Sequence, residues 1–459
     1  MHTQSALPET DYKTFFRGKK ITLMGLGLLG RGVGDAAFLA ECGAEVLVTD
    51  KKTTQELAES IQQLEKYASI TYLLGEHRLE DFRHRDMIIK AAGVPLDSPY
   101  IREAEKAGIP VYMSTALFVQ HTEATCVGIT GTRGKTTVTM LIFEALKKAY
   151  ETTDAHVYLG GNIRGVATLP LLATAKKGDI VVLELDSWQL QGFGDLGVSP
   201  HLSVFTTFLA DHMNYYKNDT AAYFADKANI FCSQTADNVC VIGEQVASVM
   251  PQAYKNKIQA HTIIASEKNL PKDWSLRIPG QHNRYNAGIA YAALHEFGVS
   301  DAAIKQVFES FAAVSGRLEK IASAQGVDIY NDTNATTPDA TVAALEAVSA
   351  AGSKNVVLIF GGADKGLDMD ALFAHIPSYC KALVLLPGSG TDRIRDTVAL
   401  LGVHTVYAHS MHEATVAAFG LVQPGDTLLM SPAFASFGIF KNEYDRGDQF
   451  VTAIKNCSV

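Results

Sequence analysis

The chain has 459 residues, of which 47% are apolar and 19% charged, and its formal net charge is −9. This length predicts two to four domains with ordinary globular cores, and the acidic balance disfavours a protein that tracks the nucleic-acid backbone. No apolar run approaches the ~20 residues of a membrane helix, and the mixed polar N-terminus is not expected to be a signal peptide. The six scattered cysteines form no CxxC pair, which indicates reduced thiols in a cytosolic enzyme.

The N-terminal stretch alternates short apolar strands with helices. A strand at 20–24 leads into the turn G-L-G-L-L-G at 25–30, and a helix at 31–41 and a second strand at 44–49 follow, ending at Asp50. A G-x-G-x-x-G turn with an acid about 20 residues further on suits NAD or another nucleotide diphosphate. A strand at 87–90, the turn A-A-G at 91–93, a helix at 99–107 and a strand at 110–113 complete an α/β unit that ends near 118–123.

A strand, a glycine-rich turn and a helix are predicted at 124–148. The turn G-I-T-G-T-R-G-K-T-T at 128–137 is a P-loop variant, with glycine at 128 where the standard spacing places it at 129. The helix N-terminus attracts an anion, Lys135 adds a formal positive charge, and the Thr136 hydroxyl can ligate nucleotide-bound magnesium. The alternative is a Gly/Thr-rich turn formed by chance, which the order of strand, Lys-Thr pair and helix disfavours.

Three more polar residues of the central stretch are candidates for a site. Glu184 lies near the end of a strand at 180–185, His212 follows a strand at 202–208, and Lys227 lies in the next helix. An acid at the end of such a strand often faces the magnesium of a P-loop, although capping carboxylates are also common there. His212 is either a ligand or a loop histidine, and Lys227 taken alone is a solvated lysine. The motif G-G-N-I at 160–163 predicts a turn.

Two asparagines open an apolar helix that is predicted at 287–297. Asn283 and Asn286 are three residues apart, so they share a face near the helix start. Asparagine carries both a donor and an acceptor, which suits the recognition of a base edge. N-capping is the alternative for one of the two.

The C-terminal third again alternates strands and helices. Strands are predicted at 327–330, 355–360, 382–386 and 427–430, and polar turns follow at 331–338, 361–366 and 431–437. This alternation predicts a second open α/β sheet with its polar turns at the carboxyl ends of strands, where ligands bind. The closing helix is expected to begin at 436–438.

Together these motifs resemble those of the Mur ligases. In chain order they are G-T-x-G-K-T-T, G-G-N-I, L-E-L-x-S-x-Q-L, D-H-M, a following lysine, G-x-H-N-x-x-N, G-R-x-E, N-D-x-x-A-T, G-G-x-D-K and S-P-A-x-A-S, and they span nearly the whole chain. The chain is most similar to the members that add D-glutamate to UDP-N-acetylmuramoyl-L-alanine. The resemblance implies an α/β fold of three domains: a Rossmann-like UDP-substrate domain at 1–120, a central P-loop ATPase domain at 121–314 and a Rossmann-like amino-acid domain at 315–459.

The resemblance also implies a reaction. ATP phosphorylates a carboxylate to an acyl phosphate, and the amine of glutamate then forms an amide during peptidoglycan precursor synthesis. Two Mg²⁺ ions are expected, and the family's carbamylated lysine falls at Lys227, where carbamylation turns a cation into an anionic metal ligand. The expected partners are UDP-N-acetylmuramoyl-L-alanine, D-glutamate and ATP, with neither nucleic acid nor membrane, and the expected protein is a cytoplasmic monomer.

Carried over residue by residue, the resemblance assigns four sets of site residues. The catalytic residues and metal ligands are Lys135, Thr136, Glu184, His212 and Lys227. The residues that bind ATP are Gly131, Thr132, Arg133, Gly134, Lys135, Thr136 and Thr137, with Asn283 and Asn286 on adenine, Arg317 on the phosphates and Asp332 on the ribose. The UDP-substrate is held by Gly25, Gly27, Leu28, Gly30, Asp50, Gly93, Asn162 and Gln189. The amino-acid pocket consists of Thr336, Lys365, Ser436 and Phe437.

The sequence departs from the family pattern at several positions. A hydroxyl of the first glycine turn is replaced by Leu29, and the serine and proline of the other diphosphate loop are A-A at 91–92. A lysine becomes Asn334, an arginine after the metal histidine becomes Tyr215, and an acid becomes Gly438. These changes bear on UDP and amino-acid recognition and leave the ATP and metal set intact.

Three other functions are weighed against this interpretation. A nicotinamide dehydrogenase would explain the first glycine turn but not the P-loop. A P-loop kinase or NTPase that forms no amide would explain neither of the other domains. A related ligase with L-glutamate or another acceptor, such as one for folylpolyglutamate, is disfavoured by the Rossmann-like first domain.

Overall fold

The computed structural model describes residues 11–457 except for Leu29, Leu96 and Asn214, so the expectation for Leu29 lies outside the described residues. The chain packs as two compact units. The first contains the chain up to Leu270 together with Asn286–Ile304, and the second contains Pro271–Tyr285 and the chain from Lys305 onward. Three parallel or mostly parallel sheets, two in the first unit and one in the second, confirm the predicted α/β fold.

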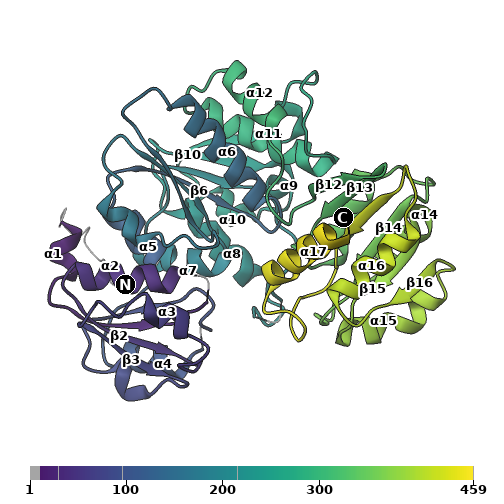
Figure 1. The fold of residues 1–459 in the computed structure, drawn as a ribbon. Coiled ribbons are helices and arrows are strands. Elements are labelled where there is room, and N and C mark those ends of the chain that lie inside the picture. The colour runs from purple at the N-terminus through teal and green to yellow at the C-terminus, as the bar shows by residue number, and fades with distance from the viewer. Residues whose placement is uncertain (1–10, 29, 96, 214, 458–459) are drawn as a thin grey trace. The chain divides into compact units, whose positions relative to one another are not determined.

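The first sheet is parallel, with the strand order β3-β2-β1-β4-β5, and it confirms the Rossmann-like prediction (Figure 1). Its strands are β1 (Lys20–Met24), β2 (Glu45–Asp50), β3 (Ile70–Leu74), β4 (Met87–Lys90) and β5 (Val111–Tyr112). Its helices are α1 (Tyr12–Phe16), α2 (Arg31–Glu41), α3 (Ala58–Gln62), η1 (Leu79–Phe82) and α4 (Pro99–Lys106). The two glycine-containing turns follow β1 and β4, which are neighbours, so both turns lie at one edge of this sheet.

The middle sheet is also parallel, with the order β11-β10-β9-β6-β8-β7. Its strands are β6 (Thr125–Thr130), β7 (Val157–Gly161), β8 (Ile180–Glu184), β9 (Leu202–Phe205), β10 (Val239–Gly243) and β11 (His261–Ala265). The helices of this region are α5 (Ser114–His121), α6 (Lys135–Ala149), η2 (Leu169–Ala173), α7 (Ser187–Leu196), α8 (Thr220–Cys232), α9 (Glu244–Val249), α10 (Gln252–Lys255), η3 (Glu267–Asn269), α11 (Gln281–His295) and α12 (Asp301–Ser310).

Three expectations for this region need correction. Gly160 and Gly161 do not form a turn, because they pair with Leu183 and Glu184 as the end of β7. β9 stops at Phe205, three residues earlier than predicted, and α11 starts at Gln281, earlier than the predicted 287. Asn283 therefore lies inside a helix and is no N-cap: its amide donates to the carbonyl of Pro279 at 2.7 Å.

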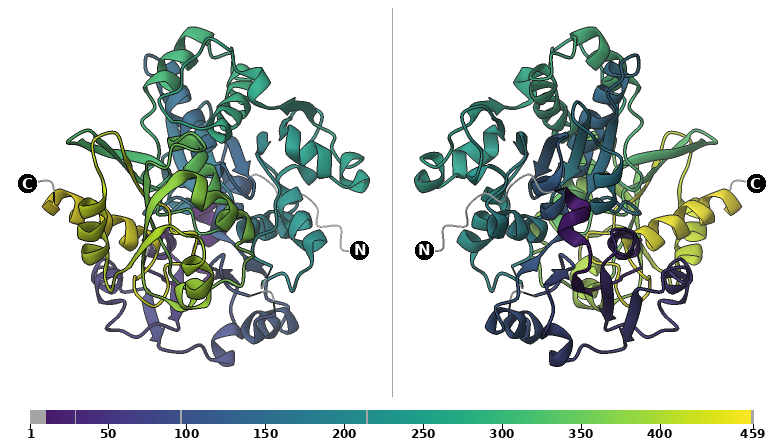
Figure 2. Two further views of the ribbon diagram at one scale, coloured as in Figure 1. Left: turned by 90° about the vertical axis from the view of Figure 1, so that its right-hand side faces the viewer. Right: turned by 90° about the vertical axis from the view of Figure 1, so that its left-hand side faces the viewer.

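The C-terminal sheet has the order β12-β13-β17-β14-β15-β16, and only β12 runs antiparallel to its neighbour. Its strands are β12 (Glu319–Ala324), β13 (Val327–Asn331), β14 (Val356–Phe360), β15 (Cys380–Leu385), β16 (His404–Tyr407) and β17 (Thr427–Met430). Its helices are α13 (Pro338–Val348), α14 (Asp370–Tyr379), α15 (Ser389–Ala399), α16 (Met411–Leu421) and α17 (Glu443–Cys457). Figure 2 shows this green-to-yellow part of the chain with helices packed around its sheet.

The closing helix α17 begins at Glu443, so the expected start at 436–438 is wrong. Gly438 has a φ of +92° in a turn, which helical backbone does not allow. Asn442 precedes the helix, and its side chain accepts a hydrogen bond from the N–H of Asp445 at 2.9 Å, as an N-cap does.

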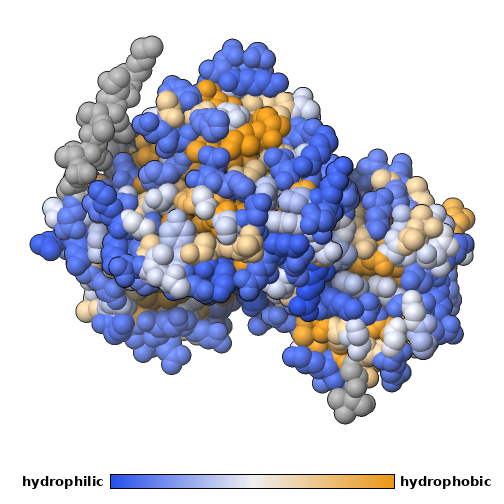
Figure 3. Space-filling view, turned by 90° about the horizontal axis from the view of Figure 1, so that it is seen from above, coloured by the Kyte–Doolittle hydropathy of each residue, from blue (hydrophilic) through white to orange (hydrophobic). Residues whose placement is uncertain are grey.

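Apolar side chains on the face drawn in Figure 3 form separate patches among polar residues. Exposed large apolar residues come from distant parts of the chain, including Leu28, Leu209, Leu400 and Phe437. In the described part of the chain, no helix combines the length and apolar character that crossing a bilayer requires.

Candidate active site

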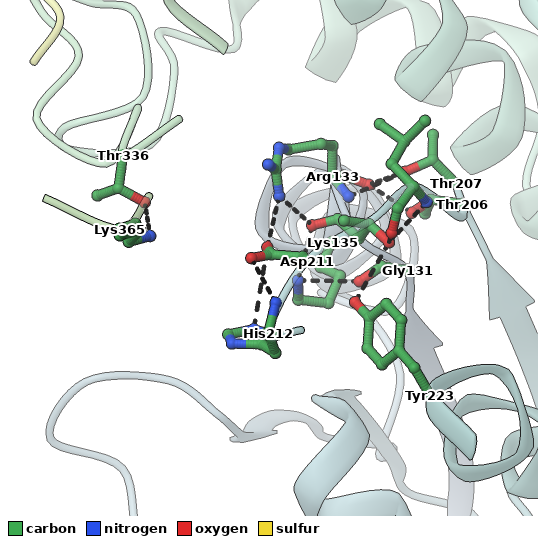
Figure 4. Close-up of polar contacts among 12 residues, drawn as sticks. Gly131, Arg133, Lys135, Thr206, Thr207, Asp211, His212, Tyr223, Thr336 and Lys365 are labelled. Atoms are coloured by element: carbon green, nitrogen blue, oxygen red, sulfur yellow. Dashed lines mark hydrogen bonds and ion pairs between the residues drawn. The ribbon is translucent and has the colours of Figure 1, made fainter. Parts of the chain in front are cut away.

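The predicted ATP and metal residues of the middle sheet gather at one edge. β6 lies between β8 and β9, and all three run parallel, so the segments after them emerge together. The P-loop follows β6, Glu184 ends β8, and His212 follows β9. Figure 4 shows Lys135, Arg133, Asp211 and His212 around this edge.

The P-loop has a conformation that requires glycine at two positions. Gly131 has a φ of +150°, and Gly134 has a φ of +83°. A Cβ atom on Gly131 would lie 1.9 Å from the hydroxyl oxygen of Thr206, and one on Gly134 would lie 2.3 Å from the amide oxygen of Asn286. Asn286 is therefore packed directly against the P-loop.

Two threonines beyond β9 fasten the loop. The Thr206 hydroxyl donates to the carbonyl of Arg133 at 2.6 Å, and the N–H of Arg133 donates to the Thr207 hydroxyl at 2.9 Å. The N–H of Thr132 donates to the carbonyl of Thr207 at 2.7 Å. Neither threonine was predicted as a site residue, because both fall inside the strand predicted at 202–208. The available signal was a pair of hydroxyls at the end of a strand that neighbours the P-loop strand.

Two cations lie at the start of the 15-residue helix α6. The Lys135 ammonium donates to the carbonyls of Gly131 at 3.0 Å and Thr132 at 3.2 Å, so the side chain folds back over the loop. The guanidinium of Arg133 donates to the Asp211 carboxylate at 2.8 Å. The helix N-terminus and these cations together favour a phosphate group.

Lys227 is buried, with 2% of its surface exposed, so its interpretation as a solvated lysine is wrong. Its ammonium donates to the carbonyl of Gly131 at 2.8 Å and lies 5.0 Å from the ring centroid of Tyr223. Burial, together with the positive charge of Lys135, lowers the pKa of Lys227 well below its ordinary value. A lower pKa favours the neutral amine, which is the form of lysine that is nucleophilic.

Glu184 and His212 flank the loop on either side. Glu184 is buried, and its Oε2 atom has no hydrogen-bond partner among the described residues, which leaves an acceptor available to a cation. His212 has a φ of +54°, and its ring lies 4.9 Å from that of Trp188. In residues 11–457, apart from the three undescribed positions, no group of three or more His, Cys, Asp or Glu residues could hold a metal; only two of the predicted ligands are of these types.

The acid predicted to follow the first glycine turn, Asp50, forms hydrogen bonds with the backbone of that turn. One carboxylate oxygen of Asp50 accepts hydrogen bonds from the N–H groups of Leu26 at 2.9 Å and Gly27 at 3.0 Å. In a dinucleotide fold the equivalent acid binds a ribose, and such N–H groups approach the pyrophosphate. Asp50 is thus bonded to its own turn, and its contact with the UDP-substrate stays a prediction. Gly93 is exposed, and so is Leu28, at 51%, in the other glycine turn of the same edge.

Two residues that are predicted to contact the substrate form hydrogen bonds with other residues of the protein. The amide oxygen of Asn162 accepts from the guanidinium of Arg31 at 2.8 Å. Gln189 is buried in a capping box, where it accepts from the N–H of Asp186 at 3.2 Å and donates to the Thr115 hydroxyl at 3.2 Å. Both positions remain predicted substrate contacts, with Asn162 the more accessible.

In the C-terminal unit, backbone bridges bring three loops together. The N–H of Ala433 donates to the carbonyl of Ala335, and Ala363 and Ala435 exchange hydrogen bonds as an isolated bridge. These contacts join the turns after β13, β14 and β17, which are neighbours in the sheet. All four predicted amino-acid residues lie on these turns: Thr336, Lys365, Ser436 and Phe437.

The predicted amino-acid residues differ in accessibility. The Lys365 ammonium donates to the Thr336 hydroxyl at 3.0 Å, so the structure brings these two together (Figure 4). Ser436 is buried, whereas Phe437 is 66% exposed. A cation beside a hydroxyl suits a carboxylate group.

Arg446, which was not predicted as a site residue, forms hydrogen bonds with two of these turns. Arg446, on α17, is fully buried. Its guanidinium donates to the carbonyls of Thr333 at 2.8 Å and Phe434 at 3.1 Å, and to the Thr333 hydroxyl at 3.2 Å. No sequence pattern marks an arginine inside a helix as buried, so only the packing reveals it.

Asp332, the predicted ribose contact, is also held internally. Its two oxygens accept from the N–H of Leu318 at 2.9 Å and the Ser431 hydroxyl at 2.8 Å. Burial raises the pKa of Asp332 to about 7, an effect that the charge of neighbouring Arg317 opposes. Its ribose role stays a prediction, as do the phosphate contact of Arg317 and the adenine contacts of Asn283 and Asn286.

Three family models match consecutive parts of the chain. They are described as "Mur ligase MurD-like, N-terminal domain" at residues 19–113, "Mur ligase middle domain" at 129–274 and "Mur ligase, glutamate ligase domain" at 316–434. The exact boundaries of the three predicted domains remain a prediction.

Full-length relatives and solved structures agree with these matches. Proteins named UDP-N-acetylmuramoylalanine–D-glutamate ligase are 32% identical in Roseiflexus sp. (strain RS-1), over 94% of this chain and 97% of the relative, and 34% identical in Geobacillus kaustophilus (strain HTA426), over 96% and 98%. The fold is similar to UDP-N-acetylmuramate-alanine ligase MurC from Thermotoga maritima, with a TM-score of 0.60 and 18% identity over 96% of this chain and all of that one. The MurF ligase from T. maritima has a TM-score of 0.57 at 13% identity, over 98% of each chain. The chain belongs to the Mur ligase family.

Proposed function

We propose that this protein joins D-glutamate to the alanine carboxylate of UDP-N-acetylmuramoyl-L-alanine, with hydrolysis of ATP to ADP and phosphate. Relatives that match over their full length carry the name of this activity. The observation that carries the proposal is the gathering of Lys135, Glu184 and Lys227 at the carboxyl edge of the middle sheet. A dehydrogenase would use neither the P-loop nor the buried lysine.

A carboxylate is a poor electrophile until one of its oxygens becomes a leaving group. Transfer of the γ-phosphoryl group of ATP to the carboxylate oxygen gives an acyl phosphate and ADP. The glutamate amine then attacks the carbonyl carbon, the C–O bond to phosphate breaks, and the amine loses a proton. In this scheme Lys135 and the α6 N-terminus stabilise the charge on the transferring phosphoryl group.

The residues at this edge fit magnesium. The unpartnered Oε2 atom of buried Glu184 is a hard anionic oxygen, the kind of ligand that Mg²⁺ takes. Thr136, Glu184, His212 and a carbamylated Lys227 would hold two ions. When bound, magnesium neutralises the negative charges of ATP and the carboxylate and so lowers the repulsion between them.

Carbamylation of Lys227 would resolve a conflict of charge. An ammonium beside a magnesium site repels the ion, whereas a carbamate attracts it. The neutral amine of Lys227 attacks carbon dioxide, a C–N bond forms, and one proton leaves to solvent. The low pKa that burial gives Lys227 supports this step, because the neutral amine is the reactive form.

The remaining substrate contacts follow the predicted assignments. The glutamate carboxylates are assigned to the turns that carry Thr336, Lys365 and Ser436, and the hydrogen bond between Lys365 and Thr336 supports this assignment. The UDP part is assigned to the first sheet, with domain limits at 120/121 and 314/315. A monomer is proposed.

A product assay tests this function. The protein is incubated with UDP-N-acetylmuramoyl-L-alanine, ATP, Mg²⁺ and single D- or L-amino acids, and products are identified by mass. The expected product contains one added D-glutamate with release of one phosphate. Phosphate release without any amide would favour an NTPase, and tight binding of NAD in place of UDP would favour a dehydrogenase.

A further inference from the structure

A cavity of about 610 Å³ lies in the first unit, bounded by the end of the first sheet and by α7 and α8. No residue of the P-loop lines it, and neither do Glu184 or His212. Its size falls within the usual range of small-molecule pockets, ~300–1,000 Å³. Its polar lining consists of Lys90, Glu105, Gln191, Asp195, Asp226 and Asn229.

Lys90 is a buried donor without an acceptor. Its side chain ends β4 with 7% of its surface exposed, and its ammonium has no hydrogen-bond partner among the described residues. Burial lowers the pKa of Lys90, and the carboxylates of Asp195, Asp226 and Glu105 oppose this shift without forming a direct hydrogen bond. An unmatched ammonium in a cavity favours a ligand that presents an anionic acceptor.

Gln191 is the complementary case, a buried acceptor without a donor. Its Nε2 atom donates to the carboxylate of Asp226 at 2.8 Å and to the Tyr215 hydroxyl at 3.3 Å. These bonds fix the amide, and the Oε1 atom is left without a partner in the described structure. With the carboxylates of Asp195 and Asp226 on the same lining, this oxygen favours a ligand that presents an amine.

We propose that this cavity binds a basic α-amino acid, with its carboxylate on Lys90 and its amines on Gln191 and the carboxylates of Asp195 and Asp226. An ammonium and a carboxylate on one small molecule satisfy both unmatched groups. Three carboxylates line the cavity against one ammonium, so a ligand with two amines balances the charge better than one with a single amine. Ile101 and Val111 supply apolar contact for the methylene groups.

Isothermal titration of the full chain with L-lysine or D-lysine, without ATP or UDP-substrate, tests this site separately from the ligase reaction. Binding of one lysine per chain is expected. Lys90→Met and Asp195→Asn should each weaken it at least about tenfold, because each removes a charged hydrogen-bonding partner. Lys106→Met and Asp237→Asn make the same charge changes at exposed positions outside the lining and should leave the affinity unchanged.

Other ligands distinguish the two halves of the proposed site. Glutamate and spermidine should both bind at least about tenfold more weakly than lysine. Glutamate carries an additional carboxylate, and spermidine has no carboxylate for Lys90. Binding of spermidine or glutamate as tight as that of lysine, or no binding of either lysine at millimolar concentration, would overturn the proposal. If circular dichroism shows that Lys90→Met does not fold, Asp195→Asn decides. An unchanged affinity of this variant for lysine contradicts the site.

Discussion

The ammonium of Lys227 lies 2.8 Å from the carbonyl oxygen of Gly131, the P-loop residue that directly follows β6. Lys227, on α8, and Lys135, on α6, thus donate hydrogen bonds to the same carbonyl of the loop, the second at 3.0 Å. Two ammonium groups on one oxygen repel each other, which contributes to the low pKa of Lys227. A carbamate on Lys227 would keep one N–H donor and remove this repulsion.

Lys227 is therefore expected to carry a carbamate in the active enzyme. Lys227→Ala should lose amide synthesis, and short carboxylic acids such as acetate should partly restore it by occupying the place of the carbamate. Carbon-13 NMR of protein equilibrated with labelled bicarbonate should show a carbamate signal that the variant lacks. Lys217→Ala, a change at an exposed lysine, is the control. A crystal of demonstrably active protein with an unmodified Lys227 would refute the prediction.

Lys135→Ala should abolish phosphate release while the fold is kept. The side chain is the cation of the P-loop, and loss of such stabilisation of a transferring phosphoryl group costs on the order of 10²–10³ in rate. Steady-state assays of phosphate and amide formation measure the effect. Lys148→Ala, near the other end of α6, should be close to wild type. Near-normal synthesis by a folded Lys135→Ala would contradict the P-loop assignment.

Asp35 predicts a pH dependence of stability. Burial raises the pKa of this carboxyl from 3.8 to about 7, and its Oδ1 atom has no hydrogen-bond partner among the described residues. Between about pH 4 and pH 7 the folded state binds more protons than the unfolded state, so stability falls as pH rises through that window. The slope from one group is at most about 1.4 kcal/mol per pH unit.

Asp35→Asn should remove this contribution. The variant should melt at a higher temperature than the wild type at pH 8, and the difference should shrink toward pH 4, where the folded-state carboxyl of the wild type is protonated and neutral. Asp154→Asn, at an exposed position, controls for charge alone. An equal difference in melting temperature at both pH values would show that the ionisation of Asp35 does not matter.

Much of the fold was predictable because its signals are local. Buried parallel strands such as β1 and β17 are short apolar runs followed by polar or glycine-rich turns, and their predicted bounds match the structure. The start of α17 was not predictable in the same way, because the turn at Gly438 and the cap at Asn442 place it several residues after Ser436.

The site residues could be predicted only where a sequence motif specifies their chemical role. The P-loop residues could be predicted from spacing, but the burial of Lys227 depends on how α8 packs against β6. The bonds from Asp50 to Leu26 and Gly27 depend on the register of β1 against β2. Such contacts join residues that are distant in sequence, and periodicity carries no information about them.

Arg446 is expected to position the amino-acid turns rather than to touch a substrate. Its hydrogen bonds join the turn after β13 to the turn after β17, which carry Thr336 and Ser436. Arg446→Lys keeps the charge but cannot make all three bonds, so the melting temperature should fall and the KM for D-glutamate should rise several-fold more than the KM for ATP. Equal increases in both KM values would indicate a general loss of structure.

The last prediction concerns the amine substrate. Lys365 is an ammonium at a turn of the C-terminal sheet, and its hydrogen bond to the Thr336 hydroxyl fixes its position. A dicarboxylic amino acid needs such a cation together with oriented donors. Lys365→Ala should therefore raise the KM for D-glutamate far more than the KM for ATP, by at least about tenfold for a lost charged hydrogen bond. Lys354→Ala, an exposed lysine before β14, should leave both values unchanged.

The same pocket predicts that D-glutamate is preferred to L-glutamate and to neutral amino acids. A neutral side chain would not accept a charged hydrogen bond from the Lys365 ammonium and should therefore bind more weakly. The wrong enantiomer could place its amine or its side-chain carboxylate correctly, but not both. Competition between D- and L-glutamate, read as kcat/KM for amide formation, measures the preference. If L-glutamate or a neutral amino acid gave a value about ten times that of D-glutamate, the specificity would be wrong, whereas the ligase activity would still stand.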